Sequence, residues 1–122
     1  MMAIATSGKN LMLDALATAV THVSLHSGFP CTGANEISGG TPAYARKAVT
    51  FGDAANGEIS ISNEPVFDVP ASTTVAAIGF WTAVTAGTMH ADYDATDEIY
   101  ANQGTYKIVS GSIALTEPSQ EE

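Results

Sequence analysis

The sequence predicts an all-β fold, either a β-sandwich or a jelly-roll-like arrangement, with one short N-terminal helix. After residue 20, the turn-forming residues glycine, proline, asparagine and aspartate recur about every six to twelve positions, which is typical of short strands joined by turns. The sequence shows no repeat of about 20 to 50 residues, which a solenoid or a propeller would require. A chain of 122 residues is long enough for one hydrophobic core, so we expect residues 1–122 to form a single domain.

Residues 8–19 are the segment expected to be helical. An apolar face without β-branched residues is expected from Leu11, Leu13, Ala15, Leu16 and Ala19. We expect this helix to take part in contacts with a partner.

The first strand is predicted at residues 22–27. Val23 and Leu25 alternate with polar residues, so the strand is expected to have one apolar and one polar face. His22 and His26 lie on the polar face, about 13 Å apart if the segment is extended, which is too far to share one metal ion.

Residues 28–42 are expected to form a long irregular loop. The segment contains four glycines and two prolines, which favour turns over regular structure. Long loops in small domains are commonly functional, and we expect this one to contact a partner.

Three strands are predicted in the middle of the chain, and in each of them bulky apolar residues alternate with polar ones. In the first of the three, Arg46 projects from the face opposite Val49 and Phe51. The predicted segments are residues 43–51, 57–62 and 67–69.

The central strand is predicted in the C-terminal half. Residues 73–83 are rich in apolar side chains and carry no charge, so this strand is expected to be buried on both faces. Residues 88–94 are predicted to form an edge strand. Residues 104–116, interrupted by a Ser-Gly pair, are expected to form two strands or one bulged strand, and residues 117–122 a flexible tail.

Charge and the length of the apolar runs each exclude one class of partner. Four basic residues stand against thirteen acidic ones, and the net charge is −9, so phosphate backbones should repel the chain. No apolar run approaches the roughly 20 residues that cross a bilayer. We therefore expect neither a nucleic-acid nor a membrane partner.

The low content of charge favours assembly. Charged residues make up 14% of the chain, against about a quarter in an average globular protein, and alanine, threonine, serine and glycine take their place. Because the cores of protein interfaces are depleted in charge, this composition suits a surface that becomes buried between subunits.

No pattern indicates catalysis, a cofactor or a resident metal. Cys31, the single cysteine, lies in the long loop and not at a helix start, where its thiolate would be favoured. The acidic residues of 92–98 lack the glycine and glutamate that a calcium-binding loop has at its sixth and twelfth positions. We expect a non-enzymatic protein with a solvated turn at residues 92–98; cation binding there is the alternative. The acidic residues of this turn are Asp92, Asp94, Asp97 and Glu98.

Seven short motifs occur in order over most of the chain. They are GKNLMLDAL (residues 8–16), HVSLH (22–26), GANE (33–36), PAYARK (42–47), PVFDVP (65–70), VAAIGFW (75–81) and QGTY (103–106). Together they resemble a family of short virion structural proteins of tailed bacteriophages. Members of this family are labelled tail-fibre-like or minor structural proteins, and similar small β-proteins decorate phage heads.

The resemblance implies a virion component without catalytic residues, made in the host cytoplasm. We expect a symmetric homo-oligomer, most simply a homotrimer, on the head exterior beside the major capsid protein, because 122 residues leave no room for both a fibre stalk and a receptor-binding tip. A tail-fibre or tail-tip protein in contact with other tail proteins is the alternative. The residues expected to contact partners are Phe29, Asn35, Glu36, Tyr44, Arg46 and Lys47.

A carbohydrate- or cell-surface-binding module is the alternative from another functional class. Aromatic rings serve such modules as platforms with an apolar body and a polar edge. In that case Trp81 or Tyr93 has to be exposed beside polar groups.

Overall fold

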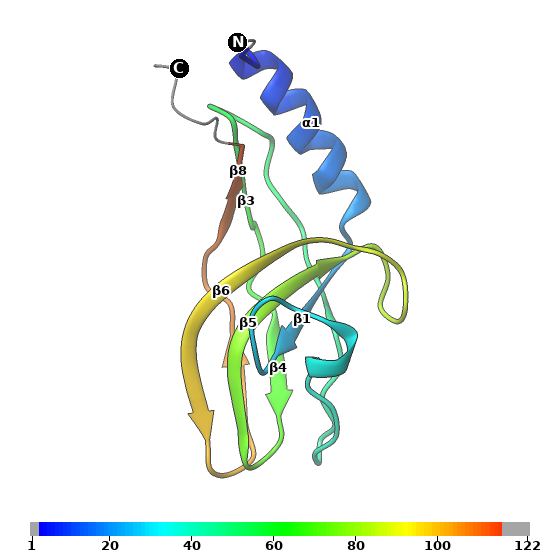
Figure 1. The fold of residues 1–122 in the computed structure, drawn as a ribbon, viewed down its shortest axis with the longest axis vertical. Coiled ribbons are helices and arrows are strands. Elements are labelled where there is room, and N and C mark those ends of the chain that lie inside the picture. Colours follow the sequence, from blue (N-terminus) through cyan, green and yellow to red (C-terminus); the bar gives the residue numbers. More distant parts are fainter. Residues whose placement is uncertain (1–2, 116–122) are drawn as a thin grey trace.

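The computed structural model describes residues 3–115, which form one N-terminal helix followed by short strands (Figure 1). The prediction of an all-β fold with a short N-terminal helix is confirmed. The predicted flexible tail, residues 117–122, lies outside the described residues. The elements are α1 (Thr6–Ala19), β1 (His22–His26), a 3-10 helix (Gly33–Asn35), β2 (Lys47–Ala48), β3 (Glu58–Ser60), β4 (Val66–Val69), β5 (Thr73–Trp81), β6 (Met89–Tyr100), β7 (Gly104–Lys107) and β8 (Ser112–Ala114).

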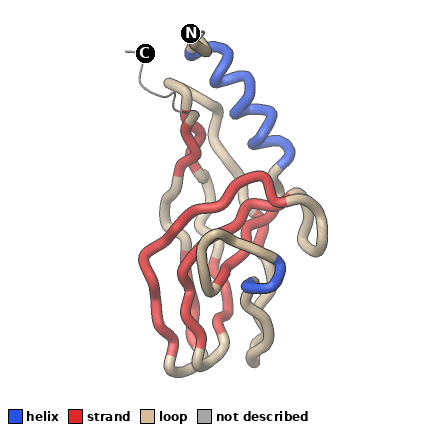
Figure 2. Tube along the Cα trace, in the orientation of Figure 1, coloured by secondary structure: helices blue, strands red, loops and turns tan. Residues whose placement is uncertain are grey.

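The strands form one four-stranded sheet and two separate pairs (Figure 2). The sheet has the order β2–β1–β5–β6, while β3 pairs with β8 and β4 pairs with β7, and every pairing is antiparallel. β5 lies between two neighbours, and its residues 75–80 are all buried. The predicted central strand is therefore confirmed.

The core lies between the four-stranded sheet and the β4–β7 pair. Val23 and Leu25 of β1 stand opposite Phe80 and Ile78 of β5, so these four side chains share one face of the sheet. Phe67 and Val69 of β4, both fully buried, pack into the same cluster. Each such side chain stabilises the fold by about 2 kcal/mol through removal of apolar surface from water.

Helix α1 lies at one end of the molecule, beside β3 and β8 and away from most of the four-stranded sheet (Figure 1). Leu13 is 1% exposed, whereas Leu11 is 73% exposed. Two polar side chains of the helix bind backbone amides of the segment before β3: Asn10 Oδ1 accepts from Gly57 N, and Asp14 Oδ1 from Ala54 N, both at 2.9 Å. The predicted apolar face is therefore only partly buried.

The strand predicted at residues 43–51 is much shorter than expected. Regular pairing with β1 is limited to β2, Lys47–Ala48. Further along β1, the amide of Leu25 donates to the hydroxyl of Tyr44 at 3.0 Å, so a side chain takes the place of a neighbouring strand. Phe51 forms an isolated bridge with Ile61.

β6 is the predicted edge strand, but it is longer than predicted. It continues to Tyr100, and pairing with β5 extends to Thr73 across a register shift. The prediction of a solvated turn at residues 92–98 is therefore wrong. The long, uncharged β5 offers its backbone N–H and C=O groups to this acidic segment, which pairs with it as a strand. At the C-terminal end, the alternative of two separate strands is correct: β7 and β8 pair with different partners.

Candidate assembly surfaces

Four of the six residues expected to contact partners bond within the chain. Asn35, Glu36, Tyr44 and Arg46 take part in hydrogen bonds that hold the long loop over the sheet. Phe29 is 49% exposed on the loop, and Lys47 is half-buried on β2. A contact of any of the six with a partner stays a prediction.

Arg46 uses its whole guanidinium group inside the molecule. Its Nε and Nη2 each donate to a carboxylate oxygen of Glu36 at 2.9 Å. Its Nη1 donates to the backbone oxygens of Ala83, at 3.1 Å, and Ala86, at 2.8 Å. The guanidinium carbon lies 3.8 Å from the ring centroid of Trp81, which adds a cation–π contact. Arg46 thereby joins the loop, β5 and the β5–β6 turn.

Glu36 is ionised by its surroundings. It accepts a hydrogen bond from the Tyr44 hydroxyl at 2.9 Å in addition to the two from Arg46. Burial alone would raise the pKa of Glu36, but the hydrogen bonds from Arg46 and Tyr44, together with the charge of Arg46, hold this pKa below its ordinary value. The pair therefore stays charged at neutral pH.

The face of β1 predicted to be polar is polar but buried. Ser24 and His26 are 0% exposed. Ser24 Oγ accepts from Trp81 Nε1 and lies against His26 Nε2, both at 2.6 Å, and His26 Nδ1 lies 2.7 Å from Asn35 Oδ1. Alternation of polar and apolar residues does not reveal this burial. Ser24 and His26 find hydrogen-bond partners in Trp81 and in Asn35 of the covering loop, and these partners take the place of water.

Gly79 makes room for this cluster. A methyl group at Gly79 would lie 2.7 Å from Ser24 Oγ, 2.9 Å from Trp81 Nε1 and 3.0 Å from His26 Nε2. Sequence reasoning missed Gly79, although a glycine inside an apolar strand often marks the close approach of another group.

Asn35 organises the loop itself. Its Nδ2 donates to the backbone oxygens of Gly28, at 3.2 Å, and Pro30, at 3.0 Å. Asn35 Oδ1 also accepts from Thr32 N at 2.8 Å, and Asn35 N donates to Thr32 Oγ1 at 3.2 Å, which forms a capping box at the start of the short 3-10 helix. The loop is therefore irregular but well bonded.

Cys31 ties the loop to β6. Its amide donates to Asp92 Oδ2 at 3.1 Å. Cys31 is 5% exposed, and burial, followed by the charges of Asp92 and Glu36, raises the pKa of its thiol to about 12. A thiol in this state is a poor nucleophile and a poor metal ligand.

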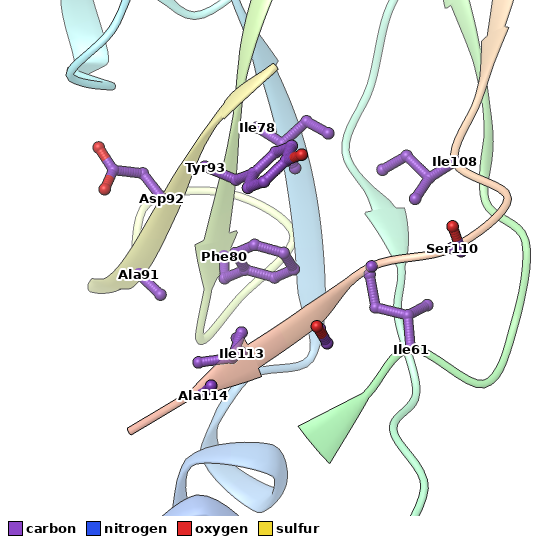
Figure 3. A pocket seen from close by; sticks show the side chains of 12 residues that line it. Ile61, Ile78, Phe80, Ala91, Asp92, Tyr93, Ile108, Ser110, Ile113 and Ala114 are labelled. Carbon is purple, nitrogen blue, oxygen red and sulfur yellow. The ribbon is translucent and has the colours of Figure 1, made fainter. Parts of the chain in front are cut away.

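A groove of about 430 Å³ opens between β6 and the segment that joins β7 to β8 (Figure 3). Ile78 and Phe80 lie at its base, and the 57% exposed ring of Tyr93 lies at its rim. Asp92 is turned away from the space in Figure 3. The opposite wall is formed by Ile61, Ile108, Ser110, Gly111, Ser112, Ile113 and Ala114.

The outer edge of β6 is acidic. Asp94, Asp97 and Glu98 are exposed, and Ile99 beside them is 80% exposed. Like charges on facing strands are destabilising, so this edge disfavours pairing with another acidic strand. Within residues 3–115, no three His, Cys, Asp or Glu side chains gather as a metal site requires, and none of the described helices is long and apolar enough to cross a membrane.

Trp81 does not offer an open ring to a sugar. The Arg46 guanidinium covers it at 3.8 Å, and the His26 ring lies nearly parallel to it, with centroids 6.4 Å apart. The indole nitrogen is bonded to Ser24. Of the two aromatic residues considered for sugar binding, Tyr93 is the exposed one.

One family model matches residues 3–116, and it describes the podophage GP4 fiber I protein gp80. The match runs from before α1 to beyond β8. The chain belongs to this family. The resemblance to short phage virion structural proteins is thereby confirmed, and this member of the gp80 family is a virion structural protein of the fibre type. No curated protein and no solved structure matched the chain.

Proposed function

We propose that this gp80-family protein is a non-enzymatic structural subunit of a phage tail fibre. The observation that carries the proposal is the family match over residues 3–116, because the family is described by a podophage fiber protein. The match favours the tail over the head exterior, which was the placement first expected. The length argument for the head assumed that one chain builds a whole fibre, whereas a fibre assembled from several proteins does not require this.

The side chains support a structural role. Cys31 is buried with a pKa of about 12, and the buried His26 has both ring nitrogens within hydrogen-bond distance of neighbours. General-base or nucleophilic catalysis requires such groups to face a reactant. The backbone amide of Cys31 bonds to Asp92 and the His26 ring to Asn35, and these bonds hold the long loop on the sheet.

The proposed partners are further copies of this chain, arranged as a homotrimer, and other tail proteins of the same phage. The net charge of −9 opposes contact between copies wherever their acidic surfaces meet. Assembly therefore calls for contact surfaces on which this charge is absent or compensated.

The placement is tested by electron microscopy of intact phage with gold-labelled antibodies raised against the purified protein. Gold on the tail supports the fibre role. Gold spread over the heads, with bare tails, would overturn it. A phage that lacks the gene provides the control for antibody specificity.

A second candidate function, binding of a cell-surface polysaccharide, is favoured by Tyr93. Its side chain lies at the rim of the groove, and Ser110 and Ser112 on the opposite wall offer polar groups to the same space. We expect purified protein to bind polysaccharide from host cells and Tyr93→Ala to lose this binding, whereas Ile99→Ala, which changes an exposed residue outside the groove, keeps it. Absence of binding by the wild-type protein would exclude this candidate.

A further inference from the structure

Helix α1 presents an apolar face to solvent. Leu11 is 73% and Met12 43% exposed. Gly8 and Ala15 lie on the same side of the helix, at spacings of three and four residues from Leu11 and Met12, and Ala19 follows four residues after Ala15. Leu13, on the other side, is buried, and the helix packs there against β3.

This exposed face carries no charge. The two charged residues of α1, Lys9 and Asp14, lie at its flanks. Asp14 Oδ1 accepts a hydrogen bond from Ala54 N. The Lys9 side chain crosses Gly57, where an added methyl group would meet Lys9 Cδ at 3.3 Å. The net charge of −9 therefore resides on other parts of the surface.

The helix has little support of its own. Its N-cap residue, Ala5, makes no side-chain capping bond, its first turn has no acidic residue, and its last turn has no basic one. A helix of 14 residues is marginal in isolation and depends on packing of its apolar faces. Within the described chain, α1 has one fully buried side chain, Leu13, so burial of the Leu11 face would add the support that it lacks.

We propose that this face is an interface between copies, in which α1 packs in parallel against α1 of a second copy. The proposal deepens the self-assembly included in the proposed function and rests on it. Charge favours a second copy on this face over one on β6. Approach of a second copy along β6 brings Asp94 and Asp97 against like charges, whereas contact through the uncharged α1 face adds no close pair of carboxylates to the repulsion between two chains of net charge −9.

The sequence of this face suits packing against itself. Gly8, Leu11, Ala15 and Thr18 follow one another at steps of three, four and three residues, which is the spacing of a helix-to-helix seam. Small residues at Gly8 and Ala15 let the helices approach, and Leu11 fills the layer between them. Since α1 lies at one end of the molecule (Figure 1), parallel helices leave room for the sheets of neighbouring copies to lie side by side.

The test compares the molar mass of three full-length proteins by light scattering across a dilution series. We expect the wild type to be an oligomer and Leu11→Glu to associate at least about tenfold more weakly, because a carboxylate in each copy would enter the seam. Ile99→Glu, which adds the same charge at an 80% exposed residue of β6, should keep the wild-type mass. Far-UV circular dichroism checks that both variants are folded.

A second variant keeps the test decisive if Leu11→Glu fails to fold. Leu11→Cys should give a covalent dimer with a short bismaleimide, while Ile99→Cys should not. The native Cys31 is buried and should not compete for the reagent.

The outcomes separate the two proposals. A monomeric wild type would overturn both self-assembly and this interface, whereas gold labelling of the tail would still support the fibre role. A wild-type oligomer that Leu11→Glu leaves intact, or that Leu11→Cys does not cross-link, would overturn the α1 interface alone.

Discussion

Gly79 leaves the space that the buried polar cluster needs. Three side-chain atoms lie within 3.0 Å of the place where a Cβ would stand. We predict that Gly79→Ala lowers the free energy of unfolding by about 2 kcal/mol, as expected for overpacking in a core. Urea denaturation followed by Trp81 fluorescence measures the change. Gly52→Ala is the matched control, because an added methyl group there meets nothing within 4 Å. Equal stability of the two variants would contradict the role assigned to Gly79.

Arg46 cannot be replaced by lysine without loss, although the charge is kept. A lysine ammonium cannot form the two-pronged bond to Glu36 and also reach the carbonyls of Ala83 and Ala86. We predict that Arg46→Lys costs about 2 kcal/mol of stability in urea denaturation, less than complete removal of a partner from a buried ion pair. Lys107→Ala, which breaks an exposed pair with Glu64, should cost well under about 1 kcal/mol. A smaller loss for Arg46→Lys than for Lys107→Ala would disprove this reading.

The thiol of Cys31 should be protected by the fold. Because burial raises its pKa to about 12, we predict that at pH 8 a disulfide reagent modifies the native protein at least about a hundredfold more slowly than the urea-unfolded chain. Absorbance of the released thiolate follows the reaction, and Cys31→Ser gives the background. Similar rates in the two states would show that the loop does not stay closed over the thiol.

For single residues, the sequence indicated which side chains form important contacts but not with what they form them. Polar and charged side chains in and beside the long loop suggested partner contacts, yet Asn35, Glu36 and Arg46 bond to the molecule itself. A single sequence does not show that the loop folds back over β1, because the bonds that hold it join residues far apart in the chain, such as Cys31 and Asp92, which are 61 positions apart.

Among the elements, the segments with one clear pattern were predicted well. The uninterrupted apolar run of β5 identified the central strand, and the alternation around Phe67 and Val69 identified β4. β6 was predicted too short, because its carboxylates resemble a solvated turn, although an edge strand also tolerates charge on its exposed side.

The acidic edge of β6 is predicted to keep free protein from pairing edge to edge. We expect the triple variant Asp94→Asn, Asp97→Asn, Glu98→Gln to scatter more light over time than the wild type at equal concentration, because neutral edge strands pair readily. The control variant Asp53→Asn, Glu58→Gln, Glu64→Gln removes the same charge away from β6. If the control aggregates as fast as the β6 variant, net charge and not the edge is responsible.

At the scale of the whole molecule, the bonds of Glu36 connect parts that no regular strand pairing joins. Through Arg46 and Tyr44, its carboxylate links the long loop with β1 and the β5–β6 turn. The all-β class and the position of the helix could be predicted from the sequence. The division into a four-stranded sheet and two pairs could not, because it depends on these long-range bonds and on side chains such as Tyr44 that replace strand pairing.

The same carboxylate should make stability depend on pH in the acid range. The pKa of Glu36 is lower in the folded protein than its ordinary value of 4.5. A lowered folded pKa means that its contribution to stability is complete above about pH 4.5 and is lost as the pH falls through the folded pKa. We predict that Glu36→Gln is less stable than the wild type at pH 7, and that this difference in urea midpoint shrinks as the pH falls through the folded pKa.

Comparison with Glu36→Gln at each pH separates this effect from protonation of the other acidic residues, which occurs in both proteins. Glu64→Gln is the matched control, because Glu64 forms an exposed pair with Lys107 and should differ little from the wild type at either pH. A difference between wild type and Glu36→Gln that is the same at both ends of the pH range would mean that the Arg46 pair does not depend on an ionised carboxylate.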